Sequence, residues 1–161
     1  MALRKPVVIN SGQLEQLQSG DTLDGLTSEN GINVINDNVG AIVIGTPVYA
    51  AAADHVDKAK ADAIGTVNVV GLMQETSTAS GGTGFMQVTG ILDATTVQWD
   101  AVVTGGAGGL VFNTIYYLDP STAGKLTSTA PTTAGQFVKE IGIALSTTEM
   151  QLANNSRRVK L

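Results

Sequence analysis

The residues with the clearest potential for chemistry lie around the single histidine of the chain. His55 has Asp54 and Asp57 beside it, and a histidine next to carboxylates is used for acid–base catalysis and for metal binding. One histidine does not make the histidine-rich shell typical of zinc, and aspartate is common in turns because its side chain hydrogen-bonds the nearby backbone. We therefore predict a turn at residues 53–55, followed by a short strand around Val56, and no catalytic or metal site.

Two glycine segments invite comparison with phosphate-binding loops. Residues 105–109 read GGAGG, and Gly124-Lys125 is followed by Leu126 instead of a hydroxyl residue. A phosphate loop needs Lys-Ser/Thr after its glycines and a helix whose N-terminus faces the phosphate, and we expect neither here. A nucleophile elbow and a calcium-binding loop are also missing from the sequence. We expect plain loops, no catalytic residue, no metal, no cofactor and no enzymatic activity.

The composition favours a small β protein. The chain has 161 residues, which is enough for one domain with its own core, and it has no cysteine for disulfides or thiolate metal sites. Its 19 glycines and its charged fraction of only 14% fit many short strands in a protein whose surface is partly covered in an assembly. No run of about 18 apolar residues predicts a membrane span, and the N-terminus is too polar for a secretory signal, so we expect synthesis in a cytoplasm.

Charge is unevenly distributed along the chain. The terminal basic residues are Arg4, Lys5, Arg157, Arg158 and Lys160, whereas every acidic residue falls between Glu15 and Glu149. An acidic body argues against nucleic-acid binding, because a phosphate backbone needs a basic face. Two interpretations of the basic ends stay open: they anchor the protein to an acidic neighbour, or they are disordered tails.

Apolar runs separated by turn residues predict an all-β fold, a small sandwich or barrel of about ten short strands with an extended N-terminal arm. We assign residues 1–31 to the arm, 32–152 to the β domain and 153–161 to a basic C-terminal tail. Residues 76–84 and 104–109 are expected to be flexible loops. The expected strands are 32–35 paired with 41–44 across a turn at 36–38, 48–50, one around Val56, 64–72, 85–92, 97–103 around a core Trp99, 111–112, 115–118, 137–145 and 149–152.

Adjacent tyrosines in one of these strands point to opposite faces. Of Tyr116 and Tyr117, one must belong to the core, and the other is either half-exposed or meets a neighbouring molecule.

The order of several motifs resembles the small β domains of tailed-bacteriophage virion proteins, most of all head decoration (cement) proteins. The motifs are GTPVYA and AIG, then GFMQVTGILDA, then NTIYYLDPSTAGKLTSTAPTTAGQFVKEIGIALS, within residues 45–152. The segment VVINSGQLEQLQSGDTL is similar to N-terminal stretches of tail-fibre and other virion proteins.

This resemblance implies a homotrimer on the outer capsid surface that binds the major capsid protein and stabilises the head. It implies production in the host cytoplasm, no direct nucleic-acid binding and no membrane. The N-terminal arm would cross to a neighbour or to the capsid. The expected capsid or subunit contacts are Arg4, Lys5, Val7, Val8, Ile9, Leu14, Leu17, Tyr116, Tyr117, Arg157 and Arg158.

Three alternatives compete with this interpretation. A tail-fibre, baseplate or head-fibre component would use the same kind of β domain, but fibres usually add coiled-coil or repeated triple-β segments. A small hydrolase on a β barrel would need an acid–base constellation. A glycan-binding module would use the loops at 76–84 and 104–109, which lack the exposed aromatic residues typical of such sites.

Overall fold

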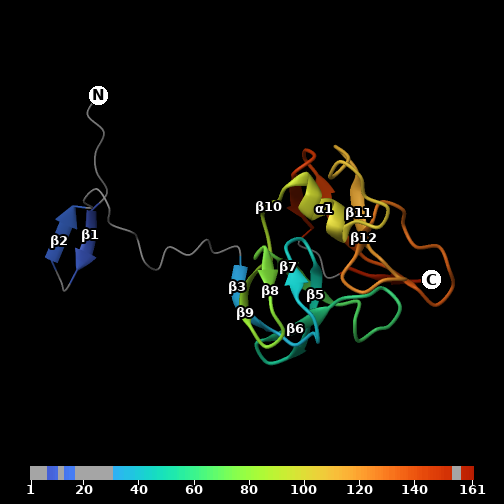
Figure 1. Cartoon of the computed structure of the whole chain (residues 1–161), viewed down its shortest axis with the longest axis horizontal. Helices are drawn as coiled ribbons and strands as arrows, with labels where there is room; N and C mark the ends of the chain where they lie inside the picture. Colours follow the sequence, from blue (N-terminus) through green and yellow to red (C-terminus); the bar gives the residue numbers. More distant parts are fainter. Residues whose placement is uncertain (1–6, 11–12, 17–30, 154–156) are drawn as a thin grey trace.

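The structure is a computed structural model that describes residues 7–10, 13–16, 31–153 and 157–161. It is nearly all β, which confirms the predicted fold class. Strands β1 (Val7–Asn10) and β2 (Gln13–Gln16) form an antiparallel hairpin within the predicted arm. The remaining described residues form a closed barrel, a five-stranded sheet, two short two-stranded pairs and one helix (Figure 1).

The barrel contains five strands in the order β3-β6-β5-β7-β9. Only the β3–β6 pair is parallel. The barrel strands are β3 (Gly31–Asn36), β5 (Pro47–Ala52), β6 (His55–Lys58), β7 (Val69–Met73) and β9 (Thr83–Gln87). Pro47 opens β5, where a residue without an N–H is tolerated. A cluster of buried side chains forms the barrel core: Val34, Ile42, Val48, Val56, Met73 and Met86.

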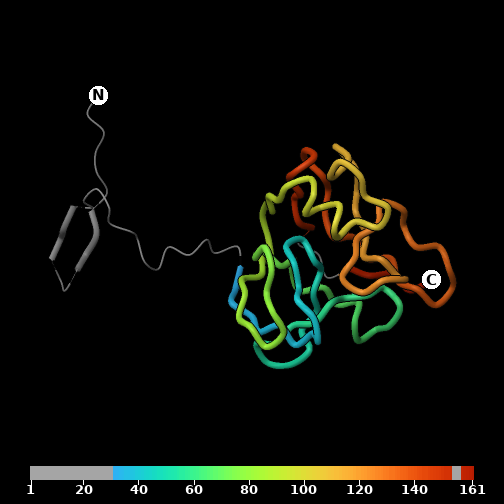
Figure 2. Tube along the Cα trace, in the orientation of Figure 1, coloured from blue at the N-terminus to red at the C-terminus, as the bar shows by residue number. Residues whose placement is uncertain are grey.

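The second sheet has the order β10-β15-β14-β11-β12 and is antiparallel throughout. Its strands are β10 (Ile91–Asp93), β11 (Ile115–Leu118), β12 (Leu126–Thr127), β14 (Glu140–Ala144) and β15 (Glu149–Leu152). The inner face of this sheet shares a large apolar cluster with Leu72 of the barrel and with helix α1 (Thr96–Val102). The barrel comes first along the chain and the sheet second, and Figure 2 shows the two stretches occupying separate regions.

The helix α1 corrects the strand predicted at residues 97–103. Thr95 accepts a hydrogen bond from the backbone of Gln98, whose side chain in turn accepts from the backbone N–H of Thr95, which is a capping box. Trp99 and Val102 are buried, three positions apart on one helical face. Trp99 is fully buried, which confirms its predicted place in the core.

Three other predicted strands also differ from the structure. The segments 32–35 and 41–44 do not pair: β3 pairs with β6 and β9, and the short β4 (Ile42–Val43) pairs with β8 (Ser77–Thr78), inside the predicted loop 76–84. The strand predicted at 64–72 begins only at Val69, because Ile64 lies in an exposed turn. Residues 111–112 form no strand, and both side chains are exposed.

The end of the chain is paired with the body. Strand β16 (Val159–Lys160) is antiparallel to β13 (Phe137–Val138), with Phe137 opposite Lys160. The Leu161 N–H donates to the carbonyl of Gln136 at 3.0 Å, and the Gly135 N–H donates to the carbonyl of Leu161 at 2.9 Å. Within the segment assigned to the basic C-terminal tail, residues 159–161 are therefore paired with residues 135–138 of the body.

One buried carboxylate holds a loop of the second sheet together. Asp119, which is buried, accepts hydrogen bonds from the Thr104 hydroxyl at 2.5 Å and from the N–H groups of Ser121 and Thr122 at 2.6 and 2.9 Å. Burial on its own raises the pKa of Asp119, but these hydrogen bonds outweigh burial, and the pKa lies below its ordinary value.

We expect Asp119→Asn to lower the free energy of unfolding by about 2 kcal/mol at pH 7, because hydrogen bonds to the charged group are lost. The pKa of Asp119 is lower in the folded chain than in the unfolded chain. The ionised carboxylate therefore contributes fully to the free energy of unfolding at pH values above the pKa in the unfolded chain. This contribution disappears as the pH falls through the pKa in the folded chain. Urea unfolding at pH 7 and near pH 3 measures this. The difference between wild type and variant should shrink in acid, whereas Asp93→Asn, at an exposed position, should change little at either pH. A difference that stays constant with pH would contradict a charge effect.

Candidate interaction surfaces

The predicted contact residues of the arm are only partly within the described structure. Arg4, Lys5 and Leu17 lie outside the described residues. Val7, Val8 and Ile9 lie in β1 and Leu14 in β2, where Ile9 is opposite Leu14 in the ladder.

The two tyrosines of β11 have different environments. Tyr116 is 2% exposed, and its hydroxyl oxygen accepts a hydrogen bond from the Val111 N–H at 3.0 Å. Tyr117 is half-buried on the opposite face of the strand. Tyr116 is therefore the core residue of the pair, and Tyr117 is the one available for contact with another molecule.

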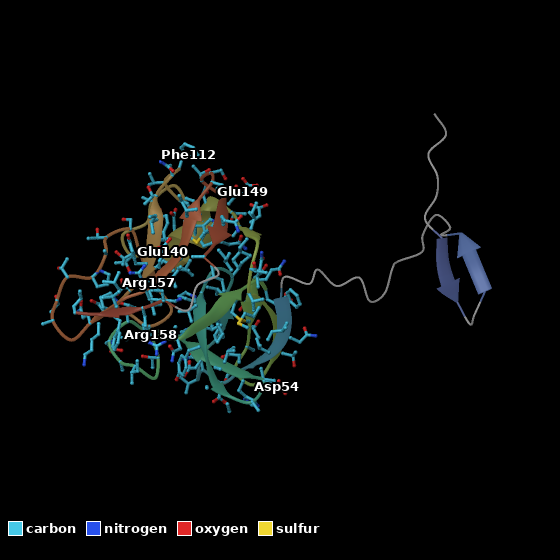
Figure 3. The ribbon with its side chains drawn as sticks, turned by 180° about the vertical axis from the view of Figure 1, so that it is seen from behind. Asp54, Phe112, Glu140, Glu149, Arg157 and Arg158 are labelled. Carbon is cyan, nitrogen blue, oxygen red and sulfur yellow. The ribbon has the colours of Figure 1, made fainter. Side chains whose placement is uncertain are left out.

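Tyr117 and Arg157 meet in one hollow of about 160 Å³, although they are far apart in the sequence. The hollow is also lined by Val138, Glu140 and Val159. Glu140 lies opposite Tyr117 in the ladder, and β16 brings the C-terminal segment alongside. Two of the predicted contact residues are thus brought to the same surface, and Arg158 lines a neighbouring groove. Figure 3 shows Glu140, Arg157 and Arg158 in the middle of the molecule, between Phe112 and Asp54 at its two ends.

A row of three isoleucines and one glutamine crosses the outer face of the second sheet. Ile91 is opposite Gln151, Gln151 is opposite Ile143, and Ile143 is opposite Ile115, so the four side chains lie on one face. Ile91 is 47% and Ile115 is 37% exposed, and no described element covers them. We call these four residues the outer row. Three further exposed apolar residues lie next to the ends of two of these strands: Leu145 directly follows β14, and Val111 and Phe112 precede β11.

Sequence reasoning missed the outer row. In Glu140–Ala144 and Ile115–Leu118, apolar side chains occur on both faces of the strand, which is a sequence signal for a second apolar face. Ile141, Tyr116 and Leu118 face inward, whereas Ile143 and Ile115 do not. The outer row could not be recognised from the sequence, because most of the strands that are neighbours in the order β10-β15-β14-β11 are far apart in the chain.

The residues around His55 form a turn and a surface pair. Asp54 adopts a φ of 61° in the turn between β5 and β6, as predicted. The His55 Nδ1 lies 3.4 Å from Asp37 Oδ1, and Asp57 accepts a hydrogen bond from the Asn38 side chain at 2.7 Å. Among the described residues, no group of three or more histidine, aspartate and glutamate side chains could hold a metal ion.

The glycine run 105–109 binds a carboxylate of the protein itself. The Gly108 and Gly109 N–H groups donate to the two oxygens of Asp100 at 2.9 and 2.8 Å. Asp100 belongs to α1, which precedes the run. The backbone donors that a phosphate would use are therefore already satisfied at these two glycines, and their role is to attach the helix to the loop.

The fold and these surfaces define an all-β protein with a barrel, a second sheet and an uncovered apolar face. No protein-family model matches the chain, and no curated protein matches its sequence significantly. Within the described residues, no helix is both long and apolar enough to cross a membrane.

Proposed function

We propose that this chain is a structural protein of a tailed-bacteriophage virion, specifically a decoration (cement) protein that binds the outer capsid surface as a homotrimer and stabilises the head. The observation that carries the proposal is the outer row, which places three isoleucines and Gln151 across four strands and leaves Ile91 and Ile115 without cover from any described element. Apolar side chains that line up on a sheet face favour burial against another molecule. The resemblance of the sequence motifs to virion β domains is the reason for proposing a phage particle as the assembly.

The outer row serves as the subunit contact in this proposal. Its centre consists of three isoleucines and Gln151, whose amide is hydrogen-bonded to the Gly90 carbonyl. Its margins are polar, with Asp93 and Glu149 at one end and Glu140 with Arg157 towards the other. A desolvated centre with a polar rim is the usual anatomy of a protein interface. Tyr117 lies next to this face and adds a residue type favoured at interfaces.

Binding to the major capsid protein is assigned to the N-terminal arm and its basic residues Arg4 and Lys5. The two basic residues near the start of the arm suit an acidic patch on the capsid, and opposite charges steer association. The protein would be made in the host cytoplasm and act on the virion without catalysis, cofactor or nucleic-acid contact.

Disruption of the outer row should dissociate the trimer. We expect Ile143→Asp to convert a species of three chains into one of a single chain, because a charge at the centre of an apolar contact is not compensated. Sedimentation equilibrium at micromolar concentration measures the mass. Val97→Asp is the matched control, since Val97 is 75% exposed on α1, and this variant should remain a trimer. A wild-type protein that is monomeric at these concentrations would contradict the proposed assembly.

The location of the protein on the virion distinguishes a head decoration protein from a tail component. Gold-labelled antibody against the protein should decorate the heads of virions from the phage that encodes it. Labelling of the tail or baseplate would favour the fibre alternative. Purified heads that lack the protein should bind the full chain, and equal binding by a chain without residues 1–12 would exclude the arm as the capsid contact.

A further inference from the structure

A groove with two cations lies where the barrel meets the second sheet. It has a volume of about 360 Å³, within the range of small-ligand sites. Its described lining residues are Val67, Asn68, Val69, Val70, Lys139 and Arg158. A smaller cavity of about 70 Å³ adjoins it and includes Glu140.

The groove combines positive charge with burial. Lys139 is only 5% exposed, and its pKa is lowered by burial and by the nearby charge of Arg158, while Glu140 acts in the opposite direction. Lys139 also interacts within the protein, and the positive field of the groove comes from the two cations together. Among the described residues that line the groove itself, none is acidic, although the chain as a whole has a net charge of −5.

The opposite wall of the groove is aliphatic. Val67 is fully buried, Val69 is half-buried, and Val70 is partly exposed. The ladder between β5 and β7 pairs Val48 with Gly71 and Tyr49 with Val69, so Val70 is the extra residue of a bulge. A bulge redirects the side chains of its strand, and here Val70 lines the groove.

We propose that this groove binds an acidic peptide segment of a partner protein, with a carboxylate beside Lys139 and Arg158 and an adjacent aliphatic side chain against Val69 and Val70. Paired cations recognise carboxylates through charge-assisted hydrogen bonds. Asn68 offers an amide to a peptide group, which a fatty acid lacks. The short aliphatic surface of Val69 and Val70 matches one aliphatic side chain better than a long acyl chain. The inference stands apart from the virion role.

The test uses the full chain and two capped dipeptides, N-acetyl-Leu-Glu-amide and N-acetyl-Leu-Gln-amide, which differ only in the carboxylate. Methyl NMR spectra should show saturable shifts at Val69 and Val70 with the Glu peptide, and binding about tenfold weaker or more with the Gln peptide. Arg158→Gln should weaken binding of the Glu peptide by about tenfold. Arg157→Gln is the matched control, because Arg157 lines the neighbouring hollow instead, and it should leave binding unchanged.

Several results would overturn the proposal. These are shifts that do not saturate, equal binding of the two peptides, and equal weakening by both arginine variants, which would indicate a diffuse charge effect. Tighter binding of hexanoate than of the Glu peptide would assign the groove to a fatty acid. Displacement of the Glu peptide by equimolar inorganic phosphate would assign it to a phosphate.

Discussion

Replacing Trp99 with alanine should lower the free energy of unfolding by about 3–5 kcal/mol. Trp99 has no exposed surface and lies in the large apolar cluster between the second sheet and the barrel. Its Nε1–H donates to the carbonyl of Thr148 at 2.7 Å. The substitution therefore leaves a cavity and removes one of the two hydrogen bonds that this carbonyl accepts, the other coming from the Ala94 N–H at 3.0 Å. Chemical denaturation of purified protein measures the loss.

Two further variants separate these contributions. Trp99→Phe keeps much of the volume but removes the hydrogen bond, and it should fall between alanine and wild type. Val97→Ala, at an exposed position of the same helix, should change stability by less than about 0.5 kcal/mol. A loss below about 1 kcal/mol in Trp99→Ala would mean that α1 is not part of the cooperative core.

Gly109→Ala should be the most damaging substitution in the glycine run. Gly109 has a φ of 87°, and a Cβ there would overlap the Thr147 carbonyl oxygen and lie 2.8 Å from Cγ2 of Thr96. The Thr147 carbonyl also accepts from the Leu110 N–H at 2.9 Å, which limits its movement. Together, the left-handed backbone and the overlap should lower the free energy of unfolding by about 3–4 kcal/mol.

Gly108→Ala is the control that measures the cost of the left-handed backbone conformation alone. Gly108 has a φ of 80°, but a Cβ there would meet nothing within 4 Å. Both glycines donate to Asp100, so the hydrogen-bonding pattern is matched. Gly108→Ala should cost only about 1–2 kcal/mol. Equal losses in the two variants, measured by the same denaturation, would show that contact with Thr147 and Thr96 contributes nothing.

The fold class was predictable because its signals are local. Short apolar runs and turn residues defined the strands 115–118 and 149–152, and Trp99 was correctly placed in the core. The strand predicted at 97–103 was wrong because Val97, Trp99 and Ala101 alternate with polar residues. The capping box at Thr95 was the better local signal.

Strand pairing was harder to predict because it is set by closure of the barrel. The predicted hairpin across 36–38 suits the local turn residues, yet β3 pairs with β9 and β6. Asn36 explains part of this: its side chain donates to the carbonyls of Gly40 and Thr78, which turns the chain away from β3 and fixes it near β8.

The surfaces depend on contacts between distant segments. The sequence predicted that one tyrosine of the pair would be buried, and the structure identifies it as Tyr116. It did not predict that Arg157 would join Tyr117, or that Lys139 and Arg158 would face Val67, Val69 and Val70. The first of these juxtapositions depends on the pairing of β11 with β14 and of β13 with β16, and the second also on the position of β7.

The order of barrel and sheet along the chain has a consequence for synthesis on the ribosome. All five barrel strands lie within residues 31–87, before the first strand of the sheet at Ile91. Chains fold from the N-terminal side as they emerge, so the barrel can close while the sheet is still being translated. Until the sheet follows, Leu72, Tyr49 and Val69 on the barrel's outer side have no apolar cover. The half-made chain is therefore the form most exposed to aggregation and to chaperones.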